Sequence, residues 1–214
     1  MNKSEKIQRK FEFEIRAEHD EKNGDYITGR PIVYDSKTDL GYFYEIIEAG
    51  ALDKADLRDV RFLVNHNQDM IPLARSRNNN ENSTMQLMVD AKGLYIRVNL
   101  DTENNTDAMN LYSAIKRGDI TGMSFMFTIN DEEWEELESD HPTRHIREIG
   151  KVFEVSAVTF PAYEDTEISA RNKEALESAK EALESARNKP LESGNAELEL
   201  EKAKIRNRIL AGGY

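Results

Sequence analysis

The stretch Gly118-Asp-Ile-Thr-Gly-Met-Ser-Phe-Met-Phe127 is typical of a chain that leaves a turn and enters a buried β-strand. Its apolar run predicts a strand over residues 123–130, with Ser124 between two large apolar side chains. A second long strand is predicted over residues 146–160, because Pro161 ends that apolar segment. The two segments indicate a core that is built on strands.

Shorter strand patterns surround these two segments. Each shows alternating apolar and polar residues, or a short apolar run beside turn residues. A turn at Lys22-Asn-Gly-Asp25 joins the first two as a hairpin. The shorter predicted strands cover residues 10–17, 26–34, 60–64, 85–90 and 93–100. Six or more strands with one or two helices predict a closed or nearly closed β-barrel in an α+β or mainly β domain.

One helix is predicted with clear ends, over residues 106–117. Thr106 is a good cap for its first turn, and two basic residues suit the dipole of its last turn. Gly118 then ends it, since glycine readily adopts the left-handed conformation that follows many helices. The helix therefore leads directly into the segment that carries Ser124.

Three polar residues lie in or beside these apolar strand segments. His66 follows the apolar run that ends at Val64, Ser124 lies near the start of a strand, and Glu154 interrupts a strand that is otherwise apolar. A base, a hydroxyl nucleophile and an acid that orients the base are the three parts of a serine-hydrolase triad. Their order along the chain differs from the chymotrypsin and subtilisin orders.

Six blocks of sequence carry a family resemblance, and together they are far more specific than a lone Gly-x-Ser. They are Gly29-Arg-Pro-Ile-Val-Tyr34, Tyr44-Glu-Ile-Ile-Glu-Ala-Gly-Ala-Leu52, Asp59-Val-Arg-Phe-Leu-Val-Asn-His66, Lys92-Gly-Leu94, Arg117-Gly-Asp-Ile-Thr-Gly-Met-Ser-Phe125 and Glu154-Val-Ser-Ala-Val-Thr-Phe-Pro-Ala-Tyr163. On these blocks the chain resembles the caudovirus prohead protease family, the serine peptidases that mature phage heads. The resemblance runs from about Tyr26 to about Arg171.

The resemblance implies an assemblin-like β-barrel flanked by helices, with Ser124 as nucleophile and His66 as base. Glu154 is the first choice for the third residue, in a strand where the related herpesvirus assemblins have a second histidine. The alternatives are that Glu154 faces solvent and that His145 or Asp119 takes this role. Backbone N–H groups are expected to bind the oxyanion, with a water or an arginine, Arg75 or Arg77, assisting.

The chain departs from the family pattern at three places. It has Asn67 where the family usually has aspartate, and Leu73-Ala-Arg-Ser76 where members often read Leu-Gly-Arg-Thr. It also has Met126 where the family usually has glycine two residues after the serine. None of these changes removes a catalytic group, but Met126 is expected to narrow the approach of a substrate strand.

Composition limits the partners and cofactors. The formal net charge of −12 disfavours binding to nucleic acid, whose phosphates would be repelled. With no cysteine there are neither disulfides nor thiolate metal sites, and no His-Glu-x-x-His motif occurs, so we expect no metal and no cofactor. Apolar runs are too short to span a membrane, and no signal peptide is indicated.

The character of the chain changes after Arg171. Glu174-Ala-Leu-Glu-Ser-Ala-Lys180 is followed by the near-copy Glu181-Ala-Leu-Glu-Ser-Ala-Arg187, which predicts a heptad-like helix. We therefore divide the chain into a protease domain, residues 1–171, and a helical, partly disordered C-terminal tail, residues 172–214. The tail is either without a role, an assembly handle for a scaffold helix, or a segment removed by autoprocessing.

The resemblance implies a serine endopeptidase that cleaves scaffold segments and the major capsid protein precursor, and also cleaves itself. Its expected location is the host bacterial cytoplasm, inside the assembling prohead, and the gene can equally be carried by a prophage. A homodimer is expected by analogy with the assemblins, although no sequence feature shows one. The alternatives are a catalytically silent assembly or scaffolding module that binds through its C-terminal helices, and an esterase for small acyl substrates.

Overall fold

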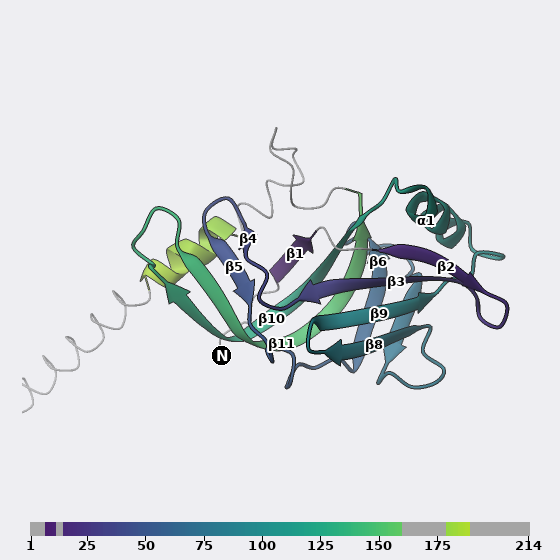
Figure 1. Ribbon diagram of the computed structural model, residues 1–214, viewed down its shortest axis with the longest axis horizontal. Helices are drawn as coiled ribbons and strands as arrows, with labels where there is room; N and C mark the ends of the chain where they lie inside the picture. The colour runs from purple at the N-terminus through teal and green to yellow at the C-terminus, as the bar shows by residue number, and fades with distance from the viewer. Residues whose placement is uncertain (1–6, 12–14, 160–178, 189–214) are drawn as a thin grey trace, which may run out of the picture.

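The computed structural model describes residues 7–11, 15–159 and 179–188 (Figure 1). It has eleven strands and one complete helix among these residues, so the predicted mainly β class is confirmed. The elements are β1 (Ile7–Phe11), β2 (Arg16–Asp20), β3 (Gly24–Val33), β4 (Thr38–Asp39), β5 (Tyr44–Ile47), β6 (Asp59–Val64), β7 (Ala74–Arg77), β8 (Met85–Asp90), β9 (Gly93–Asn99), α1 (Thr106–Arg117), β10 (Gly122–Glu135) and β11 (Thr143–Val158).

The long strands β10 and β11 form the centre of a seven-stranded sheet. They pair antiparallel along their whole length, and β1 pairs with the other edge of β10. Two strands lie parallel to β11 at different points of its length, β5 along Thr143–Ile146 and β6 along Glu154–Ala157. Strand β7 then pairs with β6. The site strands β10, β11 and β6 are thus direct neighbours.

The second sheet has four antiparallel strands in the order β2-β3-β9-β8 (Figure 1). Among the strands that the structure describes, no hydrogen-bonded ladder joins this sheet to the first one. The described strands thus form no closed barrel, and the assemblin-like barrel is not confirmed. Side chains close the β7 edge instead of a neighbouring backbone: the Arg75 N–H donates to Thr84 Oγ1 and the Arg77 N–H to Ser83 Oγ, both at 2.9 Å.

Both sheets contribute to one apolar core. Ile27 and Ile96 from the smaller sheet, and Phe62, Phe125 and Phe127 from the larger one, are fully buried members of it. Phe125 alternates with Ser124 and Met126, as the period of a strand requires. The core side chains on one face of β10 therefore hold the polar residues on its other face in register.

Helix α1 begins and ends at the predicted residues, Thr106 and Arg117. Its cap is Asn105 and not Thr106, because the Asn105 side chain accepts from the N–H groups of Asp107 and Ala108. Gly118 has the expected left-handed backbone, with φ at 80°. Buried Leu111 and Ile115 pack against the core, so the helix fixes where the chain enters β10.

The acidic segment at residues 131–140 forms the end of β10 and part of the turn that leads into β11, and most of its residues are exposed. Arg144 forms ion pairs with Glu132 and Glu45, although its side chain is only 6% exposed. Trp134 packs edge-on against Phe43, with ring centroids 4.8 Å apart. Cationic and aromatic neighbours therefore hold this acidic hairpin in place.

Residues 179–188 form a helix that lies against this hairpin end and strands β4 and β5 (Figure 1). Ala179 and Leu183 are buried against Phe43, and the Arg187 guanidinium donates to the carbonyls of Leu137 and Ser139 at 3.0 and 2.7 Å. Residues 179–188 overlap the predicted tail helix, whose full extent is not confirmed. The predictions for residues 172–178 and 189–214 lie outside the described residues. In the described part of the chain, no helix has the length and apolar character needed to cross a membrane.

Candidate active site

A tight turn after β6 places His66 over the neighbouring strand β11. Asn65 and His66 both have left-handed backbones, with φ at 52° and 57°. Asparagine tolerates this conformation better than most residues. The Asn65 side chain also bonds to Thr159 twice, donating to its hydroxyl and accepting from its N–H, both at 3.0 Å. The Asn-His pair therefore turns the imidazole back toward β11.

His66 and Glu154 form a buried pair. Their side chains are 6% and 4% exposed, and His66 Nδ1 lies 2.6 Å from Glu154 Oε1. A neutral imidazole in this contact donates its Nδ1 proton to the carboxylate, so that Nε2 becomes the acceptor. His66 Nε2 is itself buried and has no hydrogen-bond partner in the part of the chain that the structure describes. The pair thus presents an unused basic nitrogen.

Ser156 supports both members of this pair, and sequence reasoning missed it. Its fully buried hydroxyl donates to Glu154 Oε2 at 2.5 Å and accepts from the His66 backbone N–H at 3.2 Å. Both oxygens of the Glu154 carboxylate are therefore hydrogen-bonded. The available signal was its position two residues after Glu154, which places the two side chains on one face of β11.

Ser124 lies on β10 directly opposite Ser156 on β11, and Ser156 in turn lies opposite Leu63 on β6. Residues that face each other across neighbouring strands share one face of the sheet. Ser124 is therefore on the same face as Glu154 and Ser156, and His66 enters this face from the end of β6. Ser124 is completely buried in this form of the chain.

The rival candidates for the third residue have other partners. His145 contacts Glu48 and Glu135 at 3.1 and 3.4 Å. The Asp119 carboxylate accepts from the Arg117 guanidinium. Of the three candidates, Glu154 is the one that the structure places in contact with His66. No group of three or more metal-ligand side chains occurs in the described ranges.

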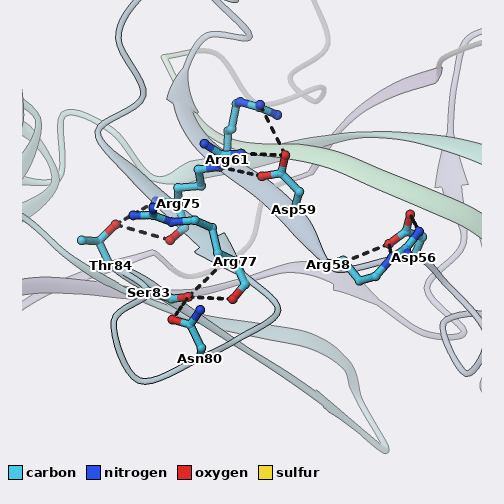
Figure 2. A network of polar contacts seen from close by, with 9 residues as sticks. All are labelled: Asp56, Arg58, Asp59, Arg61, Arg75, Arg77, Asn80, Ser83 and Thr84. Carbon is cyan, nitrogen blue, oxygen red and sulfur yellow. Dashed lines mark hydrogen bonds and ion pairs between the residues drawn. The ribbon is translucent and has the colours of Figure 1, made fainter.

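The two arginines considered as oxyanion donors lie on β7, where the Arg75 side chain contacts Asp59 and the Arg77 backbone contacts Ser83. Arg75 donates from Nε and Nη2 to Asp59 at 2.6 and 2.9 Å (Figure 2). These hydrogen bonds hold the pKa of Asp59 below its usual value. Two of the donors of Arg75 are thus already used, and a role at the oxyanion stays a prediction for Arg75 and Arg77.

A cavity of about 270 Å³ lies next to the His66–Glu154 pair. Met126 follows Ser124 by two residues on the same face of β10 and lies opposite Glu154. The cavity is lined by five apolar side chains, Leu63, Met70, Pro72, Met126 and Phe153, and by the polar side chains Arg61, Gln68 and Glu154. The space beside the site is thus mainly apolar, and one of its walls is the residue that departs from the family pattern.

The sequence model of the caudovirus prohead serine protease family matches residues 11–181 of this chain, a range that includes His66, Ser124 and Glu154. The chain belongs to the caudovirus prohead serine protease family. The prohead protease of Enterobacteria phage HK97 is 30% identical to it over 163 residues, 74% of this chain. That alignment spans 65% of the HK97 protein, so the present chain matches only part of the length of the HK97 protease.

A solved structure is also similar to this family member. The capsid assembly protease of bacteriophage T4 has 15% sequence identity and a TM-score of 0.41. The superposition covers 72% of this chain and 99% of the T4 chain.

Proposed function

We propose that this chain is a serine endopeptidase of capsid maturation, with Ser124 as nucleophile, His66 as general base and Glu154 as the group that orients His66. One observation carries the proposal: the buried His66–Glu154 pair leaves Nε2 without a hydrogen bond on the sheet face that also carries Ser124. A buried polar atom without a partner costs about 1–3 kcal/mol. Such a cost is expected where the atom has a task in the reaction.

In the proposed reaction, Ser124 Oγ attacks the carbonyl carbon of the scissile peptide bond while His66 Nε2 takes the hydroxyl proton. Glu154 stabilises the imidazolium that forms. The tetrahedral intermediate collapses when the C–N bond breaks, and Nε2 gives its proton to the leaving amine. Water then attacks the acyl-enzyme with the same base, which releases the acid and restores Ser124.

The proposed substrates are the scaffold segments and the major capsid protein precursor, together with a site in the chain's own C-terminal tail. The family membership supports this choice, because the HK97 relative is a prohead protease. We place the reaction inside the assembling prohead in the host cell, as suits a family of this kind. A homodimer belongs to the same proposal and rests on analogy with the assemblins alone.

Intact-mass spectrometry tests this function. The purified chain and its Ser124→Ala variant are incubated alone and with the capsid precursor. We expect defined fragments from the unmodified chain and none from the variant. If neither protein produces fragments, even inside assembled shells, the chain is an assembly module and not a peptidase.

We expect Ser156→Ala to lower kcat about tenfold and to shift the acidic limb of the pH–rate profile. Removing the hydroxyl takes one donor from Glu154 and leaves the His66 N–H unpaired, so the imidazolium loses part of its support. Rates measured across the pH range check this. The matched control is Ser76→Ala, another fully buried strand serine, on β7. An unshifted pH profile in Ser156→Ala, with activity equal to the control, would show that Ser156 is only structural.

We expect Met126→Gly to enlarge the cavity beside the site and to change which side chains it accepts. A glycine removes one apolar wall, so the preference for phenylalanine over alanine should rise about tenfold at one position next to the scissile bond. Peptide sets with alanine, leucine or phenylalanine at each flanking position measure this change. The matched control is Met88→Gly, an exposed methionine on β8 in the other sheet. Equal selectivity in both variants would exclude the cavity as a substrate subsite.

A further inference from the structure

Strand β1 covers the edge of the strand that carries Ser124. It pairs antiparallel with β10 over five residues, from Ile7 opposite Phe127 to Phe11 opposite Met123. Lys10 lies opposite Ser124 itself. The next strand, β2, belongs to the other sheet, so β1 does not pair with the strand that directly follows it in sequence (Figure 1). The contact is thus a short N-terminal strand that is added to the nucleophile strand.

An extended peptide commonly binds to a protein by adding a strand to an exposed sheet edge. Near Ser124 the described structure offers few such edges. One edge of β10 is paired with β11, and the other edge of β11 is paired there with β6. The remaining edge of β10 is the one that β1 occupies. A peptide that pairs with β10 beside Ser124 must therefore take the place of β1.

We propose that the edge of β10 beside Ser124 is the docking edge for the substrate as an extended strand, and that residues 7–11 occupy it as an intramolecular competitor. This inference rests on the proposed function, since it concerns how the substrate of the same site binds.

Residues 7–11 compete strongly for the edge of β10 because they belong to the same chain. A segment joined to its site by a short linker has an effective concentration in the millimolar range. Dilute substrate therefore displaces β1 poorly, whereas precursor chains packed in a shell compete much better. The described form is thus a self-blocked one, and release of β1 opens it.

An engineered disulfide between β1 and β10 tests this inference. Because the chain has no cysteine of its own, no other thiol competes for the new bond. Gln8 and Met126 are register partners, so Gln8→Cys with Met126→Cys creates a cross-strand pair. Cα atoms of directly opposite residues are about 4.5–5.5 Å apart in antiparallel strands, which a disulfide can bridge. Peptide hydrolysis is measured for the oxidised and the reduced double variant, with Gln8→Cys alone as the control.

We expect the disulfide to form under mild oxidation, and hydrolysis to be at least tenfold slower in the oxidised form than after reduction. The Gln8→Cys control should show no such redox dependence. Failure of the disulfide to form, or equal hydrolysis in both forms, would overturn the inference and leave the proposed function intact. Hydrolysis by neither form, together with none by the unmodified chain, would overturn the proposed function and this inference with it.

Proline variants of β1 test the same inference by weakening the pairing of β1 with β10, whereas the disulfide locks it. Successive N–H groups of a strand point to opposite sides, so of Arg9→Pro and Lys10→Pro only one removes an N–H that points to β10. We expect that variant to hydrolyse dilute peptide at least threefold faster than the unmodified chain, and the other variant to change the rate less. Rates unchanged in both variants would contradict self-blocking by β1.

Discussion

Replacing Ser124 by alanine should lower kcat/KM for the capsid precursor by roughly 10⁴–10⁶-fold, the range found when a serine-protease triad loses its nucleophile. The hydroxyl oxygen is the only heavy atom removed, and the residue is buried on a strand whose other face packs in the core. The fold should therefore persist, with a thermal midpoint within a few degrees of the unmodified chain. Initial rates of precursor cleavage and a thermal melt measure the two quantities.

The losses of activity in single and double variants distinguish a catalytic role of Ser124 from a structural one, because they do not add when the residues act together. His66→Ala should cost about as much as Ser124→Ala, and the double variant little more than either, because the two residues act as one unit. Ser76→Ala supplies the control for loss of a buried strand hydroxyl and should keep nearly full activity. Cleavage by Ser124→Ala at more than about one hundredth of the normal rate would remove Ser124 from the mechanism.

Replacing Glu154 by glutamine should lower kcat by about 10⁴-fold, as for the amide variant of the triad aspartate in the serine-protease template. The carboxylate now holds the Nδ1 proton of His66 at 2.6 Å. An amide NH2 directed at Nδ1 would instead favour the tautomer with the proton on Nε2, and that nitrogen could no longer accept from Ser124. Single-turnover rates with saturating peptide measure the chemical step.

Glu154→Asp is the matched control, since it keeps the charge and shortens the side chain by one methylene. It should retain more activity than Glu154→Gln, because the carboxylate still favours the proton on Nδ1, although from a greater distance. If Glu154→Gln loses less than tenfold in kcat, Glu154 does not orient the base, and the contact with His66 serves stability alone.

Local sequence patterns predicted the elements whose determinants lie close together in the chain. Helix α1 was predicted to the residue, because Gly118 and its apolar face are local signals. Its cap was misassigned, since both Asn105 and Thr106 are good capping residues and the backbone conformation decides between them. The closed barrel was not confirmed, and the reason is non-local: strand patterns do not reveal that the Ser83 and Thr84 side chains bond to the edge of β7.

Glu154 was chosen as the partner of His66 because it interrupts an apolar strand, and the resemblance supported this choice, but periodicity alone could not bring the two residues together. Alternation shows which side chains share a face of one strand, but it does not show that β6 lies parallel beside β11. Ser156 was missed for this reason, because its role depends on contacts with residues from two strands. Similarly, the pattern over residues 10–17 predicted one strand, whereas β1 and β2 belong to different sheets.

Covalent labelling tests whether Ser124 is the nucleophile. The chain is treated with a small fluorophosphonate during precursor cleavage, and the modified residue is located by peptide mass spectrometry. We expect a single adduct on Ser124, which appears as cleavage stops and is absent in His66→Ala. An adduct on another residue that stops cleavage, with Ser124 unmodified, would contradict it.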